Sequence, residues 1–258
     1  MTARLRLESW LGVVPFGVTL AAWEIASHLP GVRPATLPRP EAVLGSLAVL
    51  VSRGDLQTDI LVSLGRVALA TAISLVLGVG LGVLAALNRP LRDLLSPLAT
   101  FFNSISGIAW IPLAITWFGL GTAAVTFIIV NAVFFLVFFN TVLGVRSVPK
   151  IMEQAVQTLG GGRLVLIRDV FLPGALPYIM SGVRSGLGFG WRALIAAELI
   201  AATSGLGFLV FDASNFFRTD EVLGGILVIG VIWMATDGLV LRPLERRTIL
   251  RWGTVSSL

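Results

Sequence analysis

The sequence predicts an all-α, polytopic membrane protein with about six transmembrane helices, organised as a single transmembrane domain over residues 1–258. Composition is the first reason: 56% of the residues are hydrophobic, 13% are charged, and the mean hydropathy is +0.92. A soluble domain carries about twice that charged fraction. The second reason is that several stretches of about 20 residues are almost free of charge, which is long enough to cross a bilayer as a helix. The 28 glycines agree with this, because small residues let membrane helices approach closely.

Hydropathy gives the order of the spans along the chain. The first follows a basic N-terminus, so a cleaved signal peptide is an alternative there. A retained span is favoured because the apolar run is long, contains Glu24 and lacks a convincing A-x-A cleavage site. The six predicted spans are residues 10–29, 60–87, 94–119, 123–144, 177–203 and 221–241. Between the first two, a proline-rich extended stretch leads into an amphipathic helix predicted at the membrane surface over 41–51.

The third span contains two prolines, Pro97 and Pro112, with polar residues between them. Proline frees backbone carbonyls, which in lipid need new partners. The segment is therefore either a broken helix beside a cavity or a plain kink in a buried helix, and the sequence leaves both open.

The basic residues predict the orientation of the spans. Most of them fall on one side, namely Arg4, Arg6, Arg89, Arg92, Arg146, Lys150, Arg163, Arg168, Arg242, Arg246, Arg247 and Arg251. Arg33, Arg39, Arg53 and Arg218 fall on the other. Because cytoplasmic loops carry the excess of Lys and Arg, both termini and the 145–176 loop are predicted to be cytoplasmic.

Small and polar residues within the spans indicate how the helices pack. Gly78 and Gly82 lie four residues apart, as do Gly182, Gly186 and Gly190, and this spacing predicts close helix contacts. Asn131 and Asn140 are expected to form hydrogen bonds between helices, although lining a pathway is an alternative. Glu24 and Asp237 are expected to face protein rather than solute.

Motifs for catalysis and for nucleotide binding are missing from the sequence. There is neither H-E-x-x-H nor G-x-S-x-G, His28 is the single histidine, and there is no cysteine. A P-loop needs G-x-x-x-x-G-K-[ST], but the only lysine, Lys150, has no such glycines before it. The sequence therefore disfavours an intramembrane enzyme and predicts no metal site. Any ATP would have to be bound by another chain.

The 145–176 loop is too long for a tight turn between spans. After Pro149 it predicts a helix with Ile151, Met152, Ala155, Val156 and Leu159 on one face. Gly160–Gly162 stops that helix and permits a sharp reversal. A second short helix, RLVLIRDVF, is predicted to end at Leu172-Pro173. From pattern alone, the first helix either docks a partner or lies on its own bundle or on lipid headgroups.

The loop resembles the coupling loop of permease subunits of ATP-binding-cassette importers. That pattern is E-A-A, three residues, Gly, nine residues, then I-x-L-P, and Gly160, Val170, Leu172 and Pro173 fit it. Gln154 stands where the family has glutamate, and Glu153 lies one place early. The match to the motif therefore does not predict a charged contact with the partner. The resemblance extends over nearly the whole chain, through LPRPEAVL, WFGLGTA, FLPGALPYIMSGVRSGLGFGW, AAELIAATSGLGFLV and FFRTD. It is closest to the nitrate/sulfonate/taurine branch, and within it to taurine permeases.

The resemblance implies a type I importer (MetI-like) permease fold in a bacterial inner membrane, transporting taurine or another sulfonate, with nitrate, bicarbonate or a vitamin precursor as alternatives. It also implies a homodimer, two ATPase subunits that carry ATP and Mg, and an extracytoplasmic solute-binding protein. Residues implied to couple to the ATPase are Glu153, Gln154, Ala155, Val156, Gly160, Gly161, Arg163, Val170, Leu172 and Pro173. The residues predicted to line a pathway are Asn103, Ser106, Trp110, Arg192 and Glu198. An inward-facing Arg192 would favour an anion, but pairing with Glu198 is an equal alternative. Arg184 is expected to extend to the cytoplasmic edge.

Overall fold

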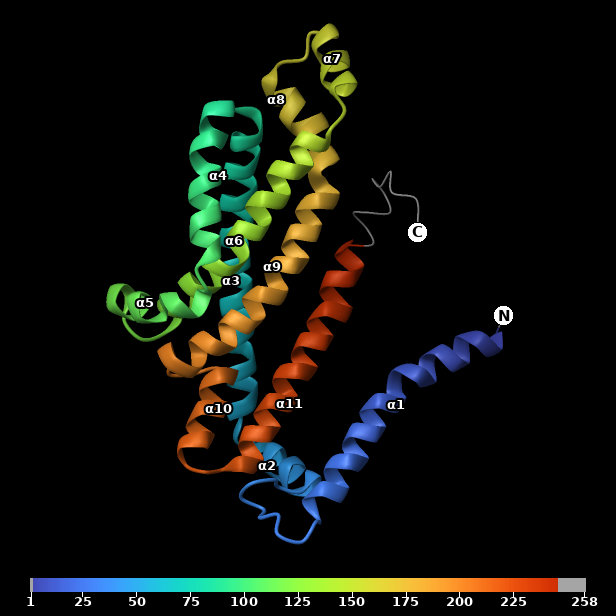
Figure 1. The fold of residues 1–258 in the computed structure, drawn as a ribbon, viewed down its shortest axis with the longest axis vertical. Helices are drawn as coiled ribbons and strands as arrows, with labels where there is room; N and C mark the ends of the chain where they lie inside the picture. Colours follow the sequence, from blue (N-terminus) through green and yellow to red (C-terminus); the bar gives the residue numbers. More distant parts are fainter. Residues whose placement is uncertain (1, 246–258) are drawn as a thin grey trace.

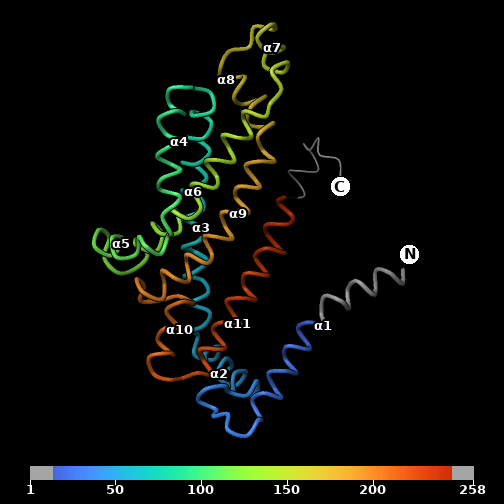
Figure 2. Tube along the Cα trace, in the orientation of Figure 1, coloured from blue at the N-terminus to red at the C-terminus, as the bar shows by residue number. Residues whose placement is uncertain are grey.

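The structure is a computed structural model that describes residues 2–245, with side chains described from residue 14 onward. All the secondary structure of the described part is helical (Figures 1 and 2). The helices are α1 Thr2–Ser27, α2 Pro40–Arg53, α3 Asp55–Leu87, α4 Arg89–Ser104, α5 Ile111–Phe118, α6 Thr122–Ser147, α7 Lys150–Thr158, α8 Arg163–Val165, α9 Leu172–Ala201, α10 Leu206–Asn215 and α11 Thr219–Thr236. A 3₁₀ turn, Gly107–Trp110, precedes α5, and π-helical turns occupy Leu166–Phe171 and Asp237–Leu241.

Four helical stretches of the described chain are long and apolar enough to cross a membrane: Asp55–Leu87, Thr122–Ser147, Arg163–Ala201 and Thr219–Glu245. The third predicted span is not one helix. Arg89–Ser104 and Gly107–Phe118 meet at 91°, so the broken form of this segment is confirmed. The first predicted span corresponds to α1, whose described apolar part, Val14–Ser27, is shorter than the others. The chain is thus a multi-pass membrane protein, and the helix predicted over 41–51 is present as α2.

Helix α6 lies at the centre of the bundle, between α3 and α9 (Figure 1). Gly78 and Gly82 of α3 face Val137 and Thr141 of α6. On the other side, Gly182 of α9 faces Asn140, while Gly186 and Gly190 face Val133. The predicted glycine faces are therefore confirmed as the surfaces through which α3 and α9 contact α6. Dispersion between closely packed backbones replaces the hydrophobic effect, which does not act between helices within lipid.

The molecule has two different ends (Figure 1). One carries α7, α8 and the turn between α3 and α4, with Arg89, Arg92, Lys150, Arg163 and Arg168. The other carries α2 and the turn between α10 and α11, with Arg39, Arg53 and Arg218. The fold therefore separates these basic residues as the positive-inside argument requires. Arg246, Arg247 and Arg251 lie outside the described residues.

We expect Gly82→Ala to destabilise the protein and Gly80→Ala to leave it unharmed. A Cβ on Gly82 would lie 2.6 Å from Thr141 Cβ and 3.1 Å from the Phe138 carbonyl oxygen, which forces α3 and α6 apart. Overpacking of this kind costs about 1–3 kcal/mol of unfolding free energy. A Cβ on Gly80 would meet nothing within 4 Å. Thermal unfolding in detergent measures both variants, and equal midpoints would contradict the packing argument.

Candidate functional site: a projecting helix pair, a polar hollow and a buried ion pair

The first candidate site is the helix pair α7–α8, which projects from one end of the bundle (Figure 1). Helix α7 ends because Gly160 adopts φ +77°, a left-handed conformation that glycine accepts without strain. Two backbone hydrogen bonds close the turn: Gly160 N–H donates to the Gln157 carbonyl at 3.0 Å, and Gly161 N–H to the Val156 carbonyl at 2.9 Å. Gly161 is packed so tightly that a Cβ would lie 2.9 Å from the Val156 carbonyl oxygen. The predicted glycine stop and reversal are confirmed.

The predicted end of the second short helix at Leu172-Pro173 is wrong. The chain stays helical from Arg163 through the π-helical turn Leu166–Phe171 and on to Ala201. Pro173 is the second residue of α9 and has no N–H to donate. The wider π-helical turn Leu166–Phe171 lies directly before it, and there the helix passes from π to α geometry without a break. Pro173 is thus no stop, and α8 is one continuous stretch with α9.

Most of the apolar face of α7 is uncovered. Ile151, Met152 and Ala155 are exposed, and Leu159 is 87% exposed. Val156 alone turns inward and packs against the core, together with Val170 and Leu172. Among the polar positions, Gln154 and Arg163 are exposed, and Glu153 accepts a hydrogen bond from Gln157 Nε2 at 3.3 Å. The helix therefore does not lie flat on its own bundle.

The second candidate site is a polar hollow of about 390 Å³ at the bend of the broken span. Asn103 and Ser106 reach it from the bend, Asn131 from α6 and Arg192 from α9. Three of the five predicted pathway residues, Asn103, Ser106 and Arg192, are thus brought together. Trp110 and Glu198 do not line it. Trp110 packs its ring against Phe102 and Phe127 instead.

Arg192 and Arg184 lie on the same helix in different electrostatic surroundings. Arg192 forms no ion pair with a carboxylate of the described chain, and its guanidinium lies 5.9 Å from the centroid of the Phe189 ring. Arg184 pairs with Asp237 at 3.3 Å and with Glu245. Arg184 therefore does not simply extend to the edge as predicted, because two carboxylates near the end of the α11 segment hold it. Asp237 faces protein, as expected.

The expectation for the two asparagines of α6 is wrong. Asn140 donates to the Leu136 carbonyl of its own helix at 2.8 Å, since Gly182 of α9 packs directly on its side chain. Asn131 lines the hollow and has no side-chain hydrogen bond in the described part of the chain. For Asn131, the structure therefore favours the alternative, in which the residue lines a pathway.

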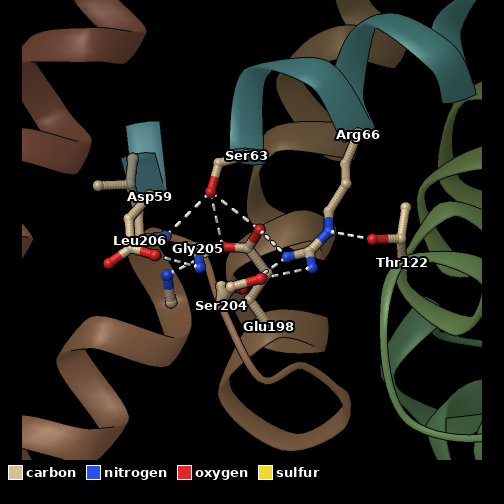
Figure 3. A network of polar contacts seen from close by, with 9 residues as sticks. Asp59, Ser63, Arg66, Thr122, Glu198, Ser204, Gly205 and Leu206 are labelled. Carbon is tan, nitrogen blue, oxygen red and sulfur yellow. Dashed lines mark hydrogen bonds and ion pairs between the residues drawn. The ribbon is translucent and has the colours of Figure 1, made fainter. Parts of the chain in front are cut away.

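The third site is a buried ion pair between Arg66 of α3 and Glu198 of α9 (Figure 3). Arg66 Nη1 lies 2.7 Å from Glu198 Oε1, with the two side chains 3% and 0% exposed. Ser63 donates to both carboxylate oxygens, at 2.8 and 2.9 Å. The guanidinium also donates to the Ser204 carbonyl at 2.7 Å and to Thr122 Oγ1 at 3.3 Å. Glu198 therefore pairs with Arg66 and not with Arg192.

The same network holds the start of α10 in place. Three successive backbone N–H groups lack helical partners there, and each finds a side chain from α3 or α9. Gly205 N–H donates to Asp59 at 2.7 Å and Leu206 N–H to Ser63 at 2.9 Å (Figure 3). Gly207 N–H donates to Glu198 at 2.9 Å. The two carboxylates also lie where the helix dipole favours negative charge. The network thus joins α3, α9 and α10 at the end of the bundle away from α7.

Comparison with known proteins now decides the family. Residues 78–242 match the model for the binding-protein-dependent transport system inner membrane component. The chain belongs to this family of importer permeases. The permease is 37% identical over 242 residues to the taurine transport system permease protein TauC of Escherichia coli (strain K12), covering 92% of this chain and 88% of that one. It is 32% identical over 244 residues to a putative aliphatic sulfonates transport permease protein, SsuC of Bacillus subtilis (strain 168), covering 94% and 88%.

The fold of the permease is also that of a solved importer. A chain of the inward-facing MetNI methionine ABC transporter superposes with a TM-score of 0.59 at 17% identity, covering 77% of this chain and 98% of that one. The similarity shows that the permease has the MetI-type fold expected from its coupling-loop motif. The relatives are named as transport permeases, in agreement with a membrane subunit rather than an enzyme.

Sequence reasoning missed the role of Arg66 and Ser63 in the permease. A signal was available, because Arg66 is the single charge of its predicted span, Glu198 is the single acidic residue of its own, and charges buried in a membrane are almost always paired. The sequence offers Arg192 as an equal alternative partner, because it is nearer to Glu198 along the chain. Spacing along one helix could not reveal a partner 132 residues away.

We expect Glu198→Gln to destabilise the permease strongly, because it leaves the Arg66 guanidinium buried without a counter-charge. Breaking a buried pair from one side costs roughly 3–5 kcal/mol of unfolding free energy. The matched control is Glu41→Gln. Glu41 Oε1 lies 3.6 Å from Arg39 Nη1 and both side chains are solvent-exposed, so we expect no measurable change in stability. Thermal unfolding in detergent compares them. Adding Arg66→Gln to Glu198→Gln should recover part of the loss, and no recovery would argue against charge imbalance as the cause.

Proposed function

We propose that this permease is the membrane subunit of an ATP-driven importer for a small anion, with taurine or another sulfonate as the first candidate. Two copies would form the pathway, two ATPase subunits would bind ATP and Mg, and an extracytoplasmic binding protein would deliver the solute. The α7–α8 end would be cytoplasmic, as would both termini. The observation that carries the proposal is the projecting helix α7, with its apolar side chains uncovered and no motif for ATP in the chain.

The geometry supplies a route for mechanical coupling. Helix α8 continues into α9 without a stop, and α9 packs on α6 through Gly182, Gly186 and Gly190. A displacement of α7 by the ATPase that passes through the Gly160–Gly162 turn would therefore reach α9, because α8 and α9 form one continuous helix. ATP can drive the change only through different affinities for the inward- and outward-facing states. The α7 contact is where that difference would enter the permease.

The apolar side chains of α7 suit a docking contact that does without the family's glutamate. Gln154 is exposed and uncharged, while Ile151, Met152 and Leu159 lie free around it. Desolvation of such side chains in a groove of the partner would stabilise the contact by about 25 cal/mol per Å² of apolar surface. The proposal is therefore an apolar contact, with Glu153 and Arg163 at its edge.

The substrate class rests on the names of the relatives, which include taurine and aliphatic sulfonate permeases. A second candidate is bicarbonate, because the bicarbonate transport system permease protein CmpB of Synechococcus elongatus is 32% identical over 232 residues. Nitrate and a vitamin precursor remain same-scaffold alternatives.

Reconstitution of the complete complex tests the substrate. We expect the ATPase rate in proteoliposomes to rise when the binding protein is loaded with taurine or an alkanesulfonate, and to stay basal with nitrate or bicarbonate. Stimulation by bicarbonate alone would assign the second candidate. If no loaded form stimulates ATP hydrolysis, the importer proposal fails.

Gly161→Ala tests the coupling route, with Gly162→Ala as the matched control. A Cβ on Gly161 would collide with Val156 and turn α7 away from its present direction, whereas a Cβ on Gly162 meets nothing within 4 Å. We expect Gly161→Ala to insert normally but to lose stimulation by the loaded binding protein, with a severalfold lower ratio of solute imported to ATP hydrolysed. Equal ratios in the two variants would show that the α7–α8 turn does not transmit the movement.

A further inference from the structure

The polar hollow at the bend of the broken span contains one charged side chain and a set of neutral polar ones. Arg192 enters from α9, Asn103 and Ser106 from the bend and Asn131 from α6. The rest of the lining is mainly apolar, formed by Ile105, Ile108, Ala132, Leu136 and Phe189. A volume of about 390 Å³ falls in the range of small-molecule sites.

The charge of Arg192 is uncompensated within the described chain. No carboxylate lines the hollow. Glu198 pairs with Arg66, and Asp237 pairs with Arg184 and Arg242, so neither forms an ion pair with Arg192. A charged side chain within a membrane span that is not paired is a functional residue by default. A second hollow, which contains Arg184 and Asp237, also shares Arg192 and Phe189 with the first. There Arg184 is neutralised by Asp237 and Glu245, which leaves Arg192 as the position where a solute anion gains most.

From this arrangement we infer that the hollow is a transport site that recognises the sulfonate head group of its solute through Arg192 and does not recognise an amino group. The inference rests on the proposed function and adds the chemistry of selection within the membrane. A sulfonate offers three oxygens around one negative charge, and the planar guanidinium can bind two of them. The amides of Asn103 and Asn131 and the Ser106 hydroxyl are the neutral donors available for the remaining oxygen.

The apolar part of the lining suits the short carbon chain of an alkanesulfonate. Two methylenes buried there contribute roughly a tenfold gain in affinity, which nitrate and bicarbonate cannot obtain. The ammonium group of taurine, by contrast, meets no carboxylate in this hollow. Discrimination between taurine and an amine-free sulfonate is thus left to the binding protein.

The test uses the complete complex in proteoliposomes, with the binding protein saturated by taurine or by ethanesulfonate. For the wild type we expect the two maximal uptake rates to agree within about twofold, because the site does not recognise the amine. Arg192→Gln should lower uptake of both solutes by about tenfold or more, the range for the loss of a hydrogen-bonded charge. Arg192→Lys should retain an intermediate rate. The matched control, Arg53→Gln, removes an exposed arginine at the end of α2 and should change neither rate.

A gain of specificity completes the test. Asn131→Asp places a carboxylate beside Arg192, so it should reduce ethanesulfonate uptake more than taurine uptake. Unchanged uptake in Arg192→Gln, or a wild type that transports taurine severalfold faster than ethanesulfonate when both saturate the binding protein, would overturn the inference. Basal ATPase activity and detergent stability show whether each variant is folded, and Ser106→Ala replaces Arg192→Gln if that variant does not fold. Failure of the proposed function would look different, since the wild type would then import no sulfonate.

Discussion

The buried pair of Arg66 and Glu198 is the interaction on which one whole end of the bundle depends. Removing two charges from water costs several kcal/mol each, and their attraction offsets this only when all remaining hydrogen-bonding groups are satisfied. Here they are satisfied by Ser63, Thr122, Ser204 and the backbone of Gly207. Because those partners come from four separate segments, the charge requirement fixes the positions of α3, α6, α9 and α10 relative to one another.

Helix α9 joins this fixed end to the projecting helix pair at the other. One end of α9 holds Glu198, its middle packs on α6 through glycines, and its other end is continuous with α8. A rigid connection is useful for coupling only if its far end is held, since a loosely packed helix would absorb a displacement by tilting. In the proposed importer, the ion pair and the contact of α7 with the ATPase are therefore both required for α9 to act as a lever. The glycine contacts with α6 let that lever carry the neighbouring helix with it.

Much of this fold was predictable because it follows from local sequence. Span order, the glycine faces and the stop at Gly160 depend on apolar length, residue size and backbone freedom, all of which can be recognised within a few residues. The partner of Glu198 was not predictable in this way, since Arg66 lies on another helix. The continuous helix through Pro173 was also missed, because a π-helical turn accommodates a proline that sequence rules treat as a stop. Both errors concern interactions that only the folded chain creates.

The charges within the spans fall into two groups once their partners are known. Arg66 pairs with Glu198, and Arg184 and Arg242 pair with Asp237 and Glu245, so each of these groups carries no net charge. Arg192 lies between these groups on α9, faces a hollow, and has no carboxylate partner among the described residues. If all three arginines served only to hold helices together, Arg192 would need an acid of its own, but Asp237, which shares a hollow with it, pairs with Arg184 and Arg242 instead. The free charge is therefore best explained by a partner that arrives from outside the chain, and an anion is the partner that its surroundings accept.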